Sequence, residues 1–94
     1  MTYTYVLLCE ADGEWYTGST RDLRLRFKQH TEGRVFSTVK RRPLRLIYYE
    51  ACLSTGDAFR RERFLKTGKG KRFLRRRLAA YLDGLRDNRL ERAR

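Results

Sequence analysis

The sequence is poor in the residues that build metal clusters and disulfide frameworks. Among its 94 residues are one histidine, His30, one proline, Pro43, and two cysteines, Cys9 and Cys52. The cysteines form no CxxC or Cys/His pattern, so we do not expect a zinc site. Both lie in apolar, strand-like segments, where a reduced cysteine acts as a small hydrophobic core residue.

Long apolar runs, linkers and repeats are also missing. The longest uninterrupted apolar run, Tyr5 to Cys9, is too short to cross a bilayer or to form the core of a signal peptide. The length suits one domain, and no low-complexity tract divides it. We therefore expect a monomeric, cytoplasmic protein with a single domain over residues 1–82, a charged tail over residues 83–94 and no membrane partner.

Acidic residues are few compared with basic ones. Lys and Arg number 23 against 11 Asp and Glu, which gives a formal net charge of +12. A membrane surface or a ribosome would also attract such a charge, but the imbalance in so short a chain favours nucleic acid. The basic loop 34–42 and the run 66–77 are the candidate phosphate-binding surfaces, with a solvated charged surface as the alternative. The residues expected to bind are Arg34, Lys40, Arg41, Arg42, Lys66, Lys69 and Lys71.

Three segments have the composition of β-strands. Residues 3–9 are nearly continuously apolar, which predicts a central strand. Asp12-Gly13 is a hairpin signal, after which residues 14–18 return as a second strand. Pro43 precedes a third strand over residues 44–52, at a position where proline is tolerated.

Capping signals predict two helices. Ser19 with Asp22 three residues later resembles a capping box, and it predicts a helix that ends near Gly33. Ser54 and Asp57 repeat the pattern for a second helix that runs to about residue 66.

A third helix is expected after the break at residues 67–70. Its apolar stripe should end near Gly84, and the tail from residue 85 should be frayed or weakly helical. The order β-β-α-β-α-α predicts an α/β fold in which a small three-stranded antiparallel sheet is flanked by helices. The stripe consists of Leu74, Leu78, Tyr81 and Leu82.

Glu62 breaks the pattern of the second helix. At about 100° per residue it falls between Ala58, Phe59 and Leu65, on the face that should be buried. A buried carboxylate needs a cation, a metal or a strong hydrogen-bond partner. A salt bridge to an arginine or an exposed position remains the alternative to a functional carboxylate.

Arg26 and His30 border the apolar stripe that Leu23 and Phe27 form on the first helix. The planar guanidinium of an arginine donates two parallel hydrogen bonds and keeps its charge, which suits a phosphate. A histidine at the edge of a core is more often hydrogen-bonded than catalytic.

Tyr5 and Tyr16 share one face of the hairpin in any register that pairs odd with even positions. A tight Asp12-Gly13 turn would set Tyr16 opposite Cys9. A four-residue connection would instead set Tyr5 opposite Gly18 and make it a diagonal neighbour of Tyr16. Tyrosines on small sheets are usually core aromatics, and spacing alone does not distinguish these two from that role.

Several motifs occur together in a recognisable order. Thr4-Tyr5-Val6 is followed by Tyr16-Thr17-Gly18, then by DLRLRFKQH over residues 22–30, RRPLRLIYYE over 41–50 and a lysine- and glycine-rich run over 61–74. The chain resembles the GIY-YIG nuclease superfamily, in particular its small stand-alone bacterial members. Thr4 stands where the family has its first glycine.

The resemblance implies a metal-dependent endonuclease that hydrolyses phosphodiester bonds in nucleic acid, DNA rather than RNA. One divalent ion, magnesium or manganese, would be held by Glu62, and Arg26 would stabilise the transition state. Tyr16 would be the base for the attacking water if a nearby cation favours its phenolate. Tyr5 and His30 would position that water or relay its proton.

Two other functions remain open at this point. The chain could be a non-catalytic nucleic-acid-binding module that retains the GIY-YIG fold, or a protein-interaction module recruited by charge, for instance at the ribosome. Many relatives carry an asparagine in the third helix, where this chain has arginines over residues 75–77. Only the nuclease needs a carboxylate that faces the phosphates.

Overall fold

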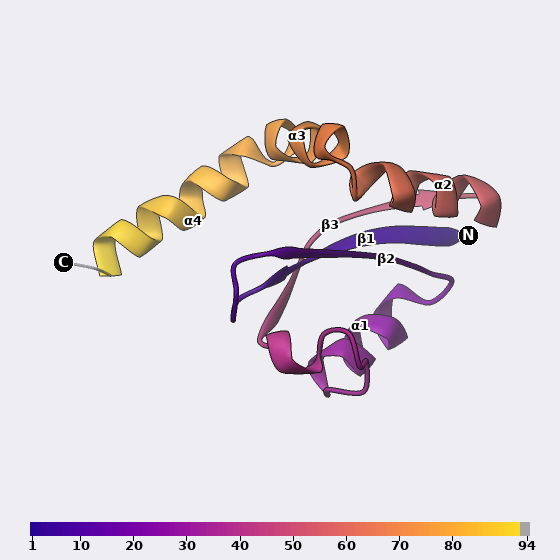
Figure 1. Cartoon of the computed structure of the whole chain (residues 1–94), viewed down its shortest axis with the longest axis horizontal. Coiled ribbons are helices and arrows are strands. Elements are labelled where there is room, and N and C mark those ends of the chain that lie inside the picture. Colours follow the sequence, from indigo (N-terminus) through magenta and orange to yellow (C-terminus); the bar gives the residue numbers. More distant parts are fainter. Residues whose placement is uncertain (93–94) are drawn as a thin grey trace. The chain divides into compact units, whose positions relative to one another are not determined.

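The computed structural model describes residues 1–92, and the side chains of residues 1–86. The chain divides into two compact units, Met1–Arg63 and Phe64–Arg94, which are described separately. The first unit contains the whole sheet, the first helix and most of the second (Figure 1). None of the described helices is long and apolar enough to span a membrane.

The sheet has three antiparallel strands in the order β2-β1-β3. They are β1 (Thr2–Cys9), β2 (Trp15–Thr20) and β3 (Leu44–Cys52). The nearly continuous apolar strand β1 is the central one, as predicted, because the centre of this sheet is covered on both faces. The predicted three-stranded antiparallel sheet is therefore confirmed.

The β1–β2 register is that of the longer connection. Tyr5 pairs with Gly18 and Leu7 with Tyr16. The Cys9 amide donates to the Glu14 carbonyl at 2.8 Å, so four residues lie between the paired ends, and Gly13 takes a φ of +73°. The tight-turn alternative, with Tyr16 opposite Cys9, is wrong.

The two faces of the sheet are covered by different helices. Tyr5, Leu7 and Cys9 point to one face, where Leu23 and Phe27 of α1 (Leu23–Thr31) pack against them. On the other face, Thr4 Oγ1 donates to the Ala58 carbonyl of α2 (Thr55–Leu65) at 2.9 Å. Figure 1 shows α1 and the start of α2 on opposite sides of the sheet. Both cysteines are free as expected, with Cys9 buried and Cys52 half-buried.

The start of α1 differs from the prediction. Asp22, not Ser19, is the N-cap, and its Oδ1 accepts from the Leu25 amide at 3.0 Å. Ser19 belongs to β2, which runs to Thr20, so it lies within the strand and is not the residue that caps α1. The helix ends at Thr31, and Gly33 follows with a φ of +79°, which favours glycine.

The second unit begins near the end of α2. As predicted, the chain breaks here: Thr67 Oγ1 accepts from the Gly70 amide at 3.1 Å and caps α3 (Gly68–Arg77). Gly70 is required by a close approach, because a Cβ there would lie 2.0 Å from the Phe64 carbonyl oxygen. The main chain thus turns sharply between α2 and α3.

The predicted third helix is two helices. Leu78 is the C-cap of α3, and α4 (Ala79–Arg92) starts directly after it, so the described part of the chain has one α-helix more than predicted. The expected end at Gly84 is wrong, because a glycine inside a helix costs only about 1 kcal/mol and does not stop it. The tail is helical up to Arg92, and residues 93–94 lie outside the described residues. The proposed boundary between residues 82 and 83 falls within α4 and stays a prediction.

Candidate active site

Three aromatic rings meet between the sheet and α1. The Tyr5 hydroxyl from β1 is hydrogen-bonded to Nε2 of His30 from α1 at 2.8 Å. The ring of Tyr16 from β2 lies 5.2 Å from His30 and 6.4 Å from Tyr5, centroid to centroid. His30 is fully buried rather than at the edge of the core. The structure therefore brings the two motif tyrosines and the histidine together.

Arg26 and Glu62 both influence the pKa of the Tyr5 hydroxyl. Arg26 is half-buried one helical turn before His30, and its guanidinium lies close enough to Tyr5 to favour the charged form of that hydroxyl. Glu62, half-buried on α2, lies within electrostatic range of Tyr5. The structure thus brings the two tyrosines and His30 into contact, with Arg26 and Glu62 within electrostatic range of Tyr5. The five residues come from four different elements.

The helix phase inferred for Glu62 is partly wrong. Ala58 and Leu65 are buried, but Phe59 is 53% exposed and lies outside the buried sector. The buried sector is narrower than the one inferred, and Glu62 lies at its edge rather than inside it. Such a position leaves Glu62 half-buried, with its charge acting on Tyr5.

Burial determines the protonation states of the two bonded partners. Burial raises the pKa of Tyr5, and the nearby Tyr16 and Glu62 charges add to this, while the hydrogen bond from Arg26 opposes it. Burial also lowers the pKa of His30 to about 4, and the Arg26 charge contributes. At neutral pH, Tyr5 is therefore a neutral phenol and His30 a neutral imidazole.

These states indicate the direction of each hydrogen bond. A guanidinium cannot accept a hydrogen bond, so among the described contacts of the Tyr5 hydroxyl the acceptor for its O–H is Nε2 of His30. Nδ1 then carries the imidazole proton and donates to Oγ1 of Thr38 at 2.7 Å. Thr38 is fully buried. This contact was missed in the sequence, because nothing in a loop without periodicity distinguishes Thr38 from the neighbouring hydroxyl residues.

Replacing Thr38 with valine should change the tautomer of His30. Valine has a similar shape but no acceptor, and a buried N–H without a partner costs about 1–3 kcal/mol. The proton is therefore expected to move to Nε2, which can donate to Tyr5. Imidazole ¹⁵N NMR reads the tautomer directly, with Thr38→Ser as the control that keeps the hydroxyl. Persistence of the Nδ1–H tautomer in Thr38→Val would contradict this hydrogen-bond chain.

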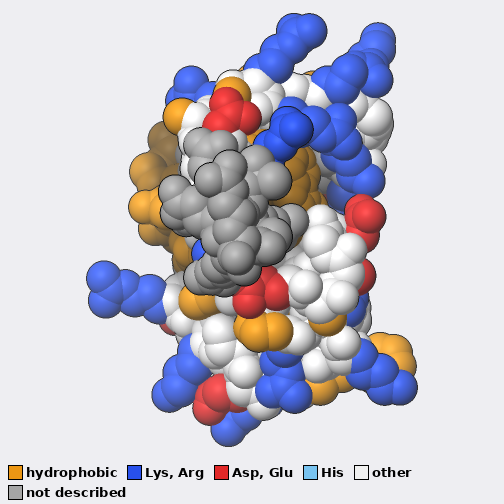
Figure 2. All heavy atoms as spheres, turned by 90° about the vertical axis from the view of Figure 1, so that its left-hand side faces the viewer, with side chains coloured by type: hydrophobic (Ala, Val, Ile, Leu, Met, Phe, Trp, Pro, Cys, Tyr) orange, Lys and Arg blue, Asp and Glu red, His pale blue; other side chains and the backbone are white. Residues whose placement is uncertain are grey.

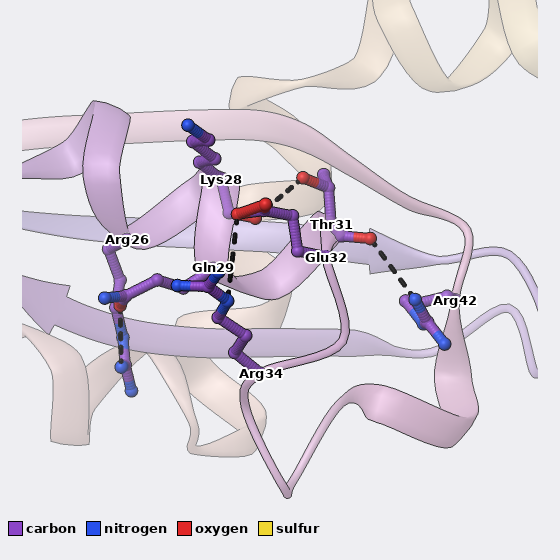
Figure 3. Close-up of polar contacts among 7 residues, drawn as sticks. All are labelled: Arg26, Lys28, Gln29, Thr31, Glu32, Arg34 and Arg42. Carbon is purple, nitrogen blue, oxygen red and sulfur yellow. Dashed lines mark hydrogen bonds and ion pairs between the residues drawn. The ribbon is translucent and has the colours of Figure 1, made fainter.

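The basic loop is more constrained than its sequence suggests. Arg41 is ion-paired with Asp12 at 2.8 Å, a contact that lowers the pKa of the Asp12 carboxyl. Arg42 donates from Nε to the Val39 carbonyl at 2.9 Å and from Nη1 to the Thr31 carbonyl at 3.4 Å (Figure 3). Both guanidinium groups thus hold the loop in place.

The remaining predicted phosphate-binding residues are exposed. Arg34 lies 4.0 Å from Glu32 in a solvent-facing pair, and Lys40 is exposed (Figure 3). Lys66, Lys69 and Lys71 are exposed in the second unit. Figure 2 shows Lys and Arg side chains at many places on the face in view, with fewer Asp and Glu. Nucleic-acid binding by these residues stays a prediction.

A multidentate metal cage is not found in the part of the chain with described side chains. Residues 1–86 contain no group of three or more His, Cys, Asp or Glu that could hold an ion. Glu62 is one half-buried carboxylate within electrostatic range of Tyr5. Magnesium commonly binds through one or two carboxylates, with water and phosphate as its other ligands. The donor set therefore fits a one-carboxylate site.

Comparison with known proteins identifies the class to which this fold and site belong. The family model for the GIY-YIG catalytic domain matches residues 1–74. The chain belongs to the GIY-YIG catalytic domain family, which is part of a nuclease superfamily. The predicted resemblance is thus confirmed.

Similar proteins are small bacterial members of this family. A UPF0213 protein of Pediococcus acidilactici is 40% identical over 76 residues, which cover 78% of this chain and 76% of the relative. One from Lacticaseibacillus paracasei is 43% identical over 61 residues, 64% of this chain and 67% of the relative. The solution NMR structure of a UPF0213 protein of Bacillus halodurans is 38% identical, with a TM-score of 0.50 over 79% of this chain and 82% of that one.

Proposed function

We propose that the protein is a divalent-metal-dependent endonuclease that hydrolyses phosphodiester bonds in nucleic acid, DNA rather than RNA. The main support is the hydrogen-bonded pair of Tyr5 and His30 with the Tyr16 ring next to it, where a guanidinium and a carboxylate lie within electrostatic range of Tyr5. A binding module needs the basic surface but has no use for a carboxylate close to the phosphates, because the negative charge of the carboxylate would repel them. The family membership and the net charge of +12 support the same reaction class.

The residues divide the chemical work. Arg26 would donate to the non-bridging oxygens of the scissile phosphate and stabilise the charge that develops there. Glu62 would hold the divalent ion, which when bound supplies further charge stabilisation at the phosphate and the leaving oxygen. Tyr5 stays protonated and anchored to His30, so acceptance of a proton from the attacking water falls to Tyr16, which would take it as the phenolate and become a neutral phenol.

The experiment is cleavage of labelled duplex, branched and single-stranded DNA and RNA with magnesium or manganese. We expect cleavage of at least one DNA substrate, complete loss of cleavage on chelation with EDTA, and retained binding, since the exposed cations do not depend on the metal. Binding should weaken steeply as salt is raised.

The rival function is a non-catalytic nucleic-acid-binding module. It is favoured by Arg75–Arg77, which occupy a stretch of α3 where many relatives carry an asparagine. Binding to the panel without cleavage of any substrate would support that module and contradict the nuclease.

A further inference from the structure

The loop after α1 is held rigidly by hydrogen bonds of its own backbone. The Arg34 amide donates to the Gln29 carbonyl at 2.9 Å, and the Thr38 and Val39 amides both donate to the Val35 carbonyl, at 3.1 and 3.0 Å. The side chains of Val35 and Thr38 are buried, and Thr38 is bonded to His30. Residues 35–38 therefore form a turn that is anchored at both ends.

Phe36 occupies the outer part of this turn. Its side chain is 96% exposed, the highest value among the large hydrophobic residues with described side chains. Burial of a phenyl group is worth about 1.5–3 kcal/mol, so holding one in water is unfavourable. The anchors at Val35 and Thr38 hold the backbone at Phe36 in the outer part of the turn.

The surroundings of Phe36 are those of a nucleic-acid surface. Arg34 and Lys40 are exposed on either side of the turn, and Thr38 connects the turn to His30 and through it to Tyr5. Cations beside an aromatic ring that offers a flat, fully exposed face are the combination that binds single-stranded nucleic acid, because every base has a π-face. The ring has no hydrogen-bonding group, so it would accept any base.

We propose that Phe36 stacks on an unpaired base of the nucleic acid, next to the phosphate at Arg26. This inference rests on the proposed function and specifies its substrate class: nucleic acid with single-stranded or unpaired bases beside the cleavage point. In an intact duplex each base is already stacked on its neighbours, so its face is not available to Phe36. The group that stacks on Phe36 in this proposal is a nucleobase, not a protein side chain.

The test is binding of the full-length protein to a fluorescently labelled oligonucleotide in EDTA, as a single strand and as the matching duplex. Phe36→Ala should weaken single-strand binding by about 5- to 100-fold, the loss expected for one base–aromatic stack. Phe36→Tyr should bind like wild type, and Phe36→Leu should lose affinity like Phe36→Ala. Leu53→Ala is the matched control, because Leu53 is 87% exposed and should contribute nothing. Duplex affinity should be the same in all variants.

Two results would overturn the inference: single-strand binding by Phe36→Ala or Phe36→Leu at wild-type strength, or an equal loss on single strand and duplex. Because the assay contains no divalent ion, it does not depend on catalysis. A chain that binds single strands through Phe36 and cleaves nothing would contradict the proposed function and support this inference. Cleavage by the protein, together with single-strand binding that Phe36→Ala does not weaken, would support the proposed function and contradict this inference.

Discussion

Replacement of Glu62 with glutamine is expected to reduce metal-dependent cleavage by on the order of 10³-fold, because an ion bound at a phosphate is worth several kcal/mol in the transition state. Glutamine keeps the shape of the side chain but removes the charge that a divalent ion needs. Nucleic-acid binding should be unchanged, since the exposed cations remain. Single-turnover cleavage and fluorescence anisotropy measure the two effects separately.

Asp57→Asn is the control for this prediction. Asp57 is an exposed carboxylate on the same helix, α2, where it is ion-paired with Arg60. An exposed pair contributes little to stability, so this variant should cleave like wild type. Cleavage by Glu62→Gln at the rate of Asp57→Asn would remove Glu62 from the mechanism.

Replacement of Gly18 with alanine should disrupt the site through Tyr5. A Cβ at position 18 would lie 2.6 Å from the Tyr5 hydroxyl oxygen and 2.7 Å from its Cζ. Tyr5 is 1% exposed and its hydroxyl is bonded to His30, so the ring cannot move without breaking that bond. We expect a destabilisation of about 1–3 kcal/mol, as for other overpacked cores, and a loss of cleavage beyond the loss of folded protein.

Urea denaturation measures the loss of stability. Cleavage measured without urea, and normalised to the amount of folded protein, measures the loss of activity. Gly84→Ala is the control: nothing lies within 4 Å of a Cβ at that position on α4, so alanine should stabilise the helix by about 0.5–1 kcal/mol. If Gly18→Ala were as stable and as active as wild type, the close contact between β2 and the Tyr5 ring would have no role.

The elements that are encoded by a few adjacent residues were predictable from the sequence. The apolar run of β1, the break at Thr67 and the strand after Pro43 lie where the sequence places them, because each is encoded within a few adjacent residues. The boundaries were less accurate. Ser19 has the chemistry of a cap, but pairing with Thr4 across β1 and β2 keeps it in the strand, and that pairing is not a local property.

The five candidate residues illustrate the same division. Position in the helices marked Arg26 and Glu62, whereas His30 and the two tyrosines could not be distinguished from core residues. The resemblance joined all five into a set. The contacts among Tyr5, Tyr16 and His30 depend on the β1–β2 register and on the packing of α1 against the sheet. Glu62 comes from α2, which packs on the opposite face. Catalysis by the set stays a prediction.

The loop after α1 was determined only by the tertiary structure. Its sequence reads as a uniform basic connection, yet Arg41 and Arg42 hold the loop, Thr38 is buried against His30 and Phe36 stands in solvent. Periodicity assigns side chains to the faces of helices and strands, and a loop has no such faces. The sequence by itself therefore determined the strands, the order of elements up to α3 and the residue types of the site. Long-range packing decided which of these residues touch, because those contacts join side chains that are far apart along the chain.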